Sequence, residues 1–86
     1  MWQVELGNSV KRKLKQIPEP DKERLKEAIR LLRDTPEALD IKKLVGRDDY
    51  RLRVGKWRFL MDIDEKEKKI IVNTLASRGE VYKNKK

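Results

Sequence analysis

The residues best suited to do chemistry are three arginines in the middle of the chain. Arg51 and Arg53 precede the dipeptide Gly55-Lys56, and Arg58 follows it. A guanidinium group presents a planar fork of donors that matches phosphate oxygens, so several of them on one rigid surface would form a cradle for a nucleic-acid backbone. Such a cluster would also stabilise the charge that develops on a phosphorane. The alternative is a solvated outer face on which the long stems splay apart into water.

These arginines supply positive charge but no general base. Arginine has a pKa above about 12 and stays protonated, so it does not remove the proton of a 2′-hydroxyl. The candidates for the base are Glu80, Tyr82 and Lys56. The ring of Tyr82 is also suited to stack on an exposed RNA base, although an aromatic plug at the edge of the core is an equal alternative for a single tyrosine in the tail.

The composition excludes several other chemistries. The chain of 86 residues has no cysteine and no histidine, so it has no thiolate and lacks the usual ligands of zinc and haem. We find no glycine-rich phosphate loop, nucleophile elbow or carboxylate cluster at metal-binding spacing, and we expect an active site without metal or another cofactor. No apolar run approaches the length of a signal peptide or a membrane span, which predicts a cytoplasmic protein.

Two alternating runs between Tyr50 and Asp64 position the arginines. They meet at Gly55-Lys56, where glycine at the first position of a two-residue loop predicts a type II′ turn between antiparallel strands. Counting outward gives the pairs Val54–Trp57, Arg53–Arg58, Leu52–Phe59, Arg51–Leu60 and Tyr50–Met61. Because side chains alternate across a strand, the apolar residues share one face and the arginines share the other. Arg53 and Arg58 are then directly opposed like charges, which costs up to roughly 1 kcal/mol and needs an explanation.

The flanking segments predict the elements that support this hairpin. Residues 2 to 6 alternate apolar and polar, as in a strand. Two helices follow. The first is capped by Asn8 or Ser9 and ends at Pro18 and Pro20, and its apolar residues are Val10, Leu14 and Ile17. The second starts near Glu19 to Asp21 and ends at about Asp34, and its apolar residues are Leu25, Ala28, Ile29 and Leu32. We place the next strand across or just after Leu44, and the β-branched run from Lys69 to Ala76, apolar on both faces, inside the sheet.

Together these elements predict an α+β fold. It consists of an N-terminal strand, an antiparallel helical hairpin and a three-stranded antiparallel β-meander, with the helices packed on one sheet face. The length fits a single domain over residues 1–86 with one small core. The other sheet face is open and displays the arginines, and the tail with Arg78 and Tyr82 starts beside the sheet.

The positive charge is distributed unevenly along the chain. Of the net charge of +8, residues 1–49 supply two, with twelve Lys/Arg and ten Asp/Glu, and residues 50–86 supply six, with eleven and five. This asymmetry indicates a polyanionic partner, and the candidate RNA contacts outside the arginine cluster are Lys11, Lys13, Lys43 and Lys56. A solvated helix face is the alternative for the first two, and a heat-adapted surface rich in Lys and Glu is the alternative for the whole pattern.

Several motifs in order resemble the RelE toxins of bacterial and archaeal toxin–antitoxin pairs. They are Lys43-Leu44-x-Gly46, the run Tyr50-Arg51-Leu52-Arg53-Val54-Gly55-Lys56-Trp57-Arg58, a β-branched strand, and Arg78-Gly79-Glu80-Val81-Tyr82. The resemblance covers nearly the whole chain, including the leading strand and the helical hairpin. It implies a RelE-like toxin domain that enters the ribosomal A site, cuts messenger RNA with a 2′-hydroxyl as internal nucleophile, and is silenced by a cognate antitoxin that wraps it.

The resemblance also implies a role for each residue of the site. It makes Arg51 and Arg53 the basic pair on the central strand, Arg58 the transition-state arginine, Arg78 a cation near the leaving group and Tyr82 the base-stacking tyrosine. Well-studied members have lysines where this chain has Arg51 and Arg53, and a lysine loses its proton far more readily than an arginine. Trp57 and Met61 stand where tyrosines are common.

Two other functions fit parts of the same pattern. A ParE-like toxin shares the fold and an antitoxin partner but inhibits DNA gyrase, which would make the arginine cluster incidental. A non-catalytic RNA- or ribosome-binding module would use the same cations to bind phosphate without cutting it. The joint presence of Arg58, Arg78 and Tyr82 favours the ribonuclease.

Overall fold

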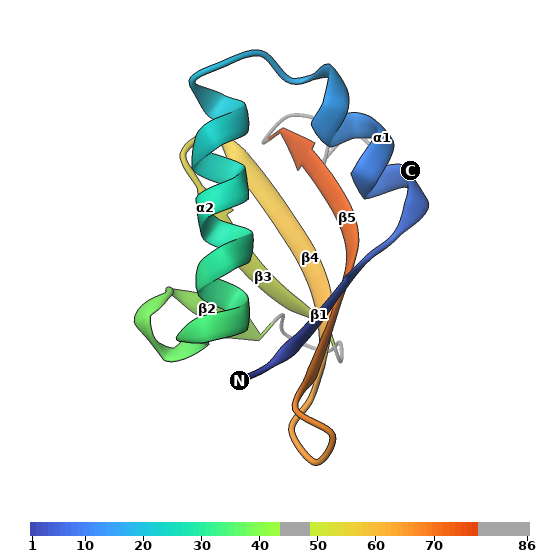
Figure 1. The fold of residues 1–86 in the computed structure, drawn as a ribbon, viewed down its shortest axis with the longest axis vertical. Helices are drawn as coiled ribbons and strands as arrows, with labels where there is room; N and C mark the ends of the chain where they lie inside the picture. The colour runs from blue at the N-terminus through green and yellow to red at the C-terminus, as the bar shows by residue number, and fades with distance from the viewer. Residues whose placement is uncertain (44–48, 78–86) are drawn as a thin grey trace.

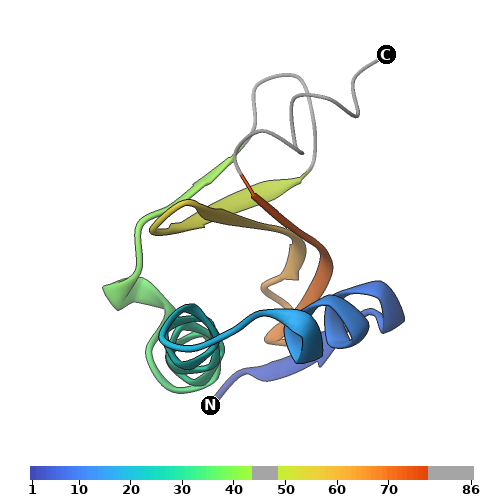
Figure 2. The same cartoon turned by 90° about the horizontal axis from the view of Figure 1, so that it is seen from above.

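The protein consists of a five-stranded sheet with two helices packed on one face (Figures 1 and 2). The computed structural model describes residues 1–43 and 49–77. The elements in chain order are β1 (Gln3–Leu6), α1 (Asn8–Gln16), α2 (Asp21–Asp34), the 3-10 helix η1 (Pro36–Ala38), β2 (Ile41–Lys43), β3 (Tyr50–Val54), β4 (Trp57–Asp64) and β5 (Lys69–Ser77). The predicted α+β architecture is confirmed.

The strands lie in the order β1-β5-β4-β3-β2. Strand β1 runs parallel to β5, and every other pair of neighbours is antiparallel. The meander therefore has four strands instead of the predicted three, because Ile41–Lys43 pairs with β3. This added strand ends before Leu44, where we had expected the next strand to lie, and Leu44 itself falls outside the described residues. Ile41 packs against the core, which favours this earlier placement.

The predicted hairpin of β3 and β4 is confirmed in every pair. Val54 lies opposite Trp57, and the register continues outward to Tyr50 opposite Met61. Gly55 has a φ of 61°, and Lys68 is the sole non-glycine residue with a positive φ in the described ranges, so Lys56 has a negative φ. This combination is that of a type II′ turn, which glycine at its first position permits.

The helices are close to their predicted limits. Helix α1 is capped by Gly7 and not by the predicted Asn8 or Ser9, and its cap residue makes no side-chain hydrogen bond. The first backbone bond of the helix runs from the amide of Lys11 to the carbonyl of Gly7 at 3.0 Å. Helix α2 ends at Asp34 as predicted. Its longest apolar stretch is too short and too charged for a membrane span, and the same holds for α1.

One core lies between the helices and the sheet. Its fully buried large side chains come from both layers: Phe59, Leu25, Leu32, Leu52, Met61, Ile70, Val10 and Val72. Strand β5 lies between β1 and β4, as the apolar composition of both its faces predicts. The arginine-bearing hairpin is therefore fixed from below by the core and from one side by β5.

Strand β5 also contains a bulge that the sequence did not indicate. Leu60 pairs with Thr74, but the next residue, Met61, pairs with Val72, so Asn73 is inserted between two ladder positions. The Asn73 amide donates to Asp62 Oδ2 at 3.2 Å. Val72 and Leu75 are three positions apart, which would place them on opposite faces of a regular strand. Because a bulge resets the alternation of side chains, both reach the core.

Candidate functional site

Three predicted site residues share the sheet face that is turned away from the helices. Arg53 lies opposite Arg58, and Arg51 lies opposite Leu60 on the same face. The next strand adds Lys42, which pairs with Arg51 and is exposed. We refer to Lys42, Arg51, Arg53 and Arg58 as the arginine face. Lys42 was missed by sequence reasoning, although extending the register of Arg51 by one strand would have found it.

The arginines of this face differ in their exposure. Arg53 is exposed and Arg51 is half-buried, whereas Arg58 is only 3% exposed. The Arg58 Nη1 donates a hydrogen bond to the carbonyl oxygen of Trp57 at 3.2 Å. The prediction of a fully solvated arginine cluster is therefore wrong for Arg58, which lies on the central strand β4. The solvated description holds for Arg53.

Burial of Arg58 changes what its charge is able to do. An ion with few water neighbours interacts with a nearby anion in a lower effective dielectric than a surface ion does. Its direction is also restricted by packing, so little reorganisation is needed when a phosphate arrives. Ala76 on β5 pairs with Arg58, lies on the same sheet face and is only 2% exposed. The centre of the arginine face thus provides a fixed, largely dehydrated cation beside an exposed one.

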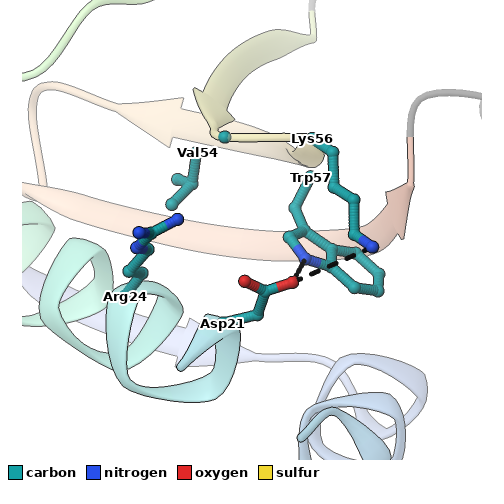
Figure 3. Close-up of a pocket in the computed structure, with 6 residues that line it drawn as sticks. Asp21, Arg24, Val54, Lys56 and Trp57 are labelled. Carbon is teal, nitrogen blue, oxygen red and sulfur yellow. Dashed lines mark hydrogen bonds and ion pairs between the residues drawn. The ribbon is translucent and has the colours of Figure 1, made fainter. Parts of the chain in front are cut away.

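A polar contact attaches the hairpin turn to the start of α2 (Figure 3). The indole Nε1 of Trp57 donates to Asp21 Oδ2 at 3.0 Å. Lys56 Nζ lies 4.0 Å from the same oxygen and 5.7 Å from the centroid of the Trp57 ring. We call Asp21, Lys56 and Trp57 the turn anchor. Asp21 is also in the first turn of α2, where a carboxylate interacts favourably with the helix dipole.

A hollow of about 270 Å³ lies beside the turn anchor on the helix side of the sheet. Arg24 and Val54 complete its wall together with the anchor residues and Gly55. Lys56 in its wall lies 4.0 Å from the Asp21 carboxylate, and the strands separate the hollow from the arginine face. The hollow therefore belongs to the junction between the hairpin and α2, and the surface suited to RNA is the opposite sheet face.

The other predicted RNA contacts do not join the arginine face. Lys11 and Lys13 lie on α1, in the helix layer. Lys43 pairs with Tyr50, whose side chain packs against the core, so Lys43 occupies the helix-side face of its strand. Lys56 belongs to the turn anchor. Arg78, Glu80 and Tyr82 lie outside the described residues, and their predicted roles stay predictions.

The described part of the chain contains no cluster of three or more potential metal ligands among its acidic side chains. Within it, carboxylates accept hydrogen bonds from neutral donors, as Asp62 does from the Asn73 amide and Asp21 from the Trp57 indole. The chemistry open to the arginine face is therefore phosphate binding and charge stabilisation by guanidinium and ammonium groups.

Comparison with known proteins places this geometry in a family. No family model matches the sequence. RelE1 of Methanocaldococcus jannaschii, a toxin-family protein, is 34% identical over 87 residues, and the alignment covers 96% of this chain and 97% of that protein. The chain belongs to the RelE toxin family. The family resemblance inferred from the sequence motifs is thereby confirmed.

Solved RelE structures share the fold. The chain is 30% identical to a protein in the RelE–RelB complex of Pyrococcus horikoshii, with a TM-score of 0.78 over 91% of this chain and 96% of that one. The chain is 25% identical to a protein in the RelB–RelE complex of Methanococcus jannaschii, with a TM-score of 0.79 over 96% of this chain and 100% of that one. Isolated RelE of Escherichia coli, at 20% identity and a TM-score of 0.68, covers 98% of this chain and 94% of its own, and shares the RelE fold.

Proposed function

We propose that this RelE-family chain is the toxin of a type II toxin–antitoxin pair and a metal-independent endoribonuclease that cleaves messenger RNA in the ribosomal A site. The observation that carries the proposal is the buried guanidinium of Arg58 directly opposite exposed Arg53. The two guanidinium groups carry like charges on one sheet face. A phosphate held there would interact favourably with both of them.

In the proposed reaction, the arginine face holds the scissile phosphate while the RNA attacks itself. The 2′-oxygen forms a bond to the adjacent phosphorus, the bond from phosphorus to the 5′-oxygen breaks, and the products are a 2′,3′-cyclic phosphate and a 5′-hydroxyl. The 2′-hydroxyl proton goes to a base, and the departing 5′-oxygen takes up a proton. Arg51 and Arg53 bind the phosphate backbone with help from Lys42, and Arg58 stabilises the extra negative charge of the phosphorane.

The base in this scheme is Glu80 or Tyr82. Of the three candidates, Lys56 is directed toward Asp21 on the helix side, with its ammonium 4.0 Å from that carboxylate. This direction keeps the amine away from the arginine face. We further assign Tyr82 to base stacking and Arg78 to the leaving group, as the family resemblance implies. Without a histidine, much of the rate must come from alignment of the substrate, which the ribosome imposes on messenger RNA.

The proposed inhibitor is a cognate antitoxin. The similar archaeal structures are RelE–RelB complexes, and this chain covers 96% or more of the RelE chains in them. An antitoxin that covers the arginine face would block RNA directly. Toxin, antitoxin and ribosome would meet in the cytoplasm.

Induction of the chain alone, followed by pulse-labelling and primer extension, tests the proposal. We expect protein synthesis to stop while DNA synthesis continues, and we expect new 5′ ends of messenger RNA at A-site codons. Continued protein synthesis with accumulating DNA breaks would favour a gyrase inhibitor instead. Arrest without new RNA ends would favour a binding module that does not cut. Rapid cleavage of a plain oligonucleotide without ribosomes would contradict the dependence on ribosomal alignment.

A further inference from the structure

A second cationic surface lies in the helix layer. It includes the half-buried side chain of Leu14 on α1. The residues that line this groove of about 300 Å³ are Lys11, Leu14, Lys15, Lys22 and Lys26, and we call it the lysine groove. Apart from Leu14, every side chain in its wall is a lysine.

The charges of the lysine groove are not neutralised within the described residues. No carboxylate of those residues lies within 4.0 Å of an ammonium group of the groove, in contrast to Arg30 further along α2. Arg30 forms ion pairs with Glu27 and with Asp34, the latter at 3.2 Å. The same helix thus pairs its cations on one side and leaves them unpaired where it faces α1.

The spacing of these lysines opposes folding. Lys11 and Lys15 are four residues apart on α1, and Lys22 and Lys26 are four residues apart on α2. Like charges at this spacing are neighbours on a helix surface and destabilise it. Lys22 is also in the first turn of α2, where the helix dipole disfavours a cation. A binding role explains why these unfavourable placements occur together in one groove.

The position of the groove separates it from the proposed active site. Both helices pack on one face of the sheet, and the arginine face is the other (Figure 2). The two surfaces are therefore separated by the sheet and the core. A polyanion in the lysine groove is a different segment from the strand held by the arginines.

The composition of the groove indicates the class of ligand. Protein–protein interfaces are depleted in lysine and enriched in aromatic residues, methionine and arginine, whereas this groove has four lysines and one partly covered leucine. Flexible ammonium groups without stacking partners suit a phosphate backbone and not base edges. We infer that the lysine groove is a second RNA-binding site, which takes the phosphate backbone of a structured RNA. This inference goes beyond the proposed function and does not depend on cleavage.

The test is binding of the full chain to an RNA hairpin of about 20 base pairs, measured by fluorescence anisotropy at several salt concentrations. The test variant is Lys15→Gln/Lys22→Gln. Its matched control is Arg33→Gln/Lys66→Gln, which removes the same charge from exposed positions outside the groove. Two lost phosphate contacts should lower the slope of log K against log salt by about two and the affinity at 0.1 M salt by about tenfold or more. The control should lose less than twofold.

Thermal unfolding of the same variants separates binding from folding. We expect the test variant to melt no earlier than the wild type, because it loses like-charge pairs. Equal losses of affinity in both variants, or no loss in either, would overturn the inference, and so would preferential binding of an acidic helical peptide over the hairpin. A chain that binds the hairpin through the groove but does not cleave on ribosomes would support the inference while overturning the proposed function.

Discussion

The arginine face and the lysine groove are both cationic but are built in different ways. The arginines project from paired strands whose backbone is held by a ladder on each side, and one of them is buried. The lysines project from two helices on long flexible stems and remain in contact with water around Leu14. Fixed guanidinium groups suit the stabilisation of one charge distribution, such as a phosphorane. Mobile ammonium groups suit attraction of a polyanion without a defined orientation.

The largest effect should follow from removal of the fixed cation. We expect Arg58→Ala to lower single-turnover cleavage on programmed ribosomes by about a hundredfold or more, as loss of a preorganised oxyanion donor does. Arg53→Ala, on the exposed partner, should cost about tenfold, because a solvated charge is screened. Equal effects for the two variants would mean that burial of Arg58 adds nothing to catalysis.

We expect Arg58 to contribute to folding as well, whereas the sequence pattern alone predicts no such contribution. A solvated arginine opposite Arg53 would leave stability unchanged or slightly raised on removal, by relief of repulsion. Because Arg58 is buried and donates to the Trp57 carbonyl, we expect Arg58→Ala to destabilise the fold by about 1–3 kcal/mol. Cleavage is therefore compared well below the melting temperature. Arg58→Lys, which keeps the charge but not the fork, should restore part of the activity if the charge acts in the chemistry.

The next largest effect concerns the turn anchor, which connects the hairpin of the arginine face to the helix of the lysine groove. Trp57→Phe removes the indole N–H and leaves the partly buried Asp21 carboxylate without that donor, so we expect a loss of about 1 kcal/mol in the free energy of unfolding. Trp2→Phe is the matched control, because the Trp2 indole N–H has no hydrogen bond within the described residues. Denaturant titration measures the free energy of unfolding of both variants. Equal losses would mean that Trp57 stabilises the fold by packing of its ring and not by its hydrogen bond.

A smaller effect of opposite sign is expected in the lysine groove. Lys22→Gln removes a like-charge neighbour of Lys26 and a cation from the first turn of α2, and we expect it to raise the free energy of unfolding by about 0.5 kcal/mol. Higher salt should reduce this gain, because the groove is exposed. A loss of stability that persists in high salt would show that Lys22 serves packing and would weaken the contrast between the two surfaces.

The smallest effect concerns the paired cation on α2. The hydrogen bond from Arg30 lowers the pKa of Glu27 below its usual value and raises that of Arg30. A lowered carboxyl pKa in the folded state means that its stabilisation is present above the unfolded-state pKa and is lost as pH falls through the folded-state pKa. We expect Glu27→Gln to give a slightly flatter decline of melting temperature in this acidic range. If the melting temperature of the variant falls with pH as that of the wild type does, the Glu27–Arg30 pair contributes nothing to stability in solution.

Local patterns in the sequence predicted the hairpin and the sides of its strands. A two-residue loop fixes its own register, so the opposition of Arg53 and Arg58 follows from the position of Gly55. The helices followed from apolar spacing and the prolines between them. These features depend on residues that are near one another in the chain.

The remainder depends on residues brought together by the whole fold. The burial of Arg58 could not be read from the alternation of its strand, and the Asp21–Trp57 bond joins residues 36 positions apart. The bulge at Asn73 shifts the alternation in a run whose faces were both apolar, so periodicity gave no sign of it. The short strand β2 lies in a weakly patterned segment, so its residues indicated no register that would place Lys42 beside Arg51.

The parallel pairing of β1 with β5 has a consequence for the order in which the chain folds. Gln3 pairs with Lys69 and Leu6 with Val72, so the paired residues at this edge of the sheet are far apart in the sequence. The hairpin of β3 and β4, by contrast, is closed by a loop of two residues. Distant contacts form slowly because a long loop must first be closed. During synthesis, β1 would leave the ribosome early and wait for its partner strand. The hairpin that carries the arginines is then complete before the sheet has acquired its outer strand.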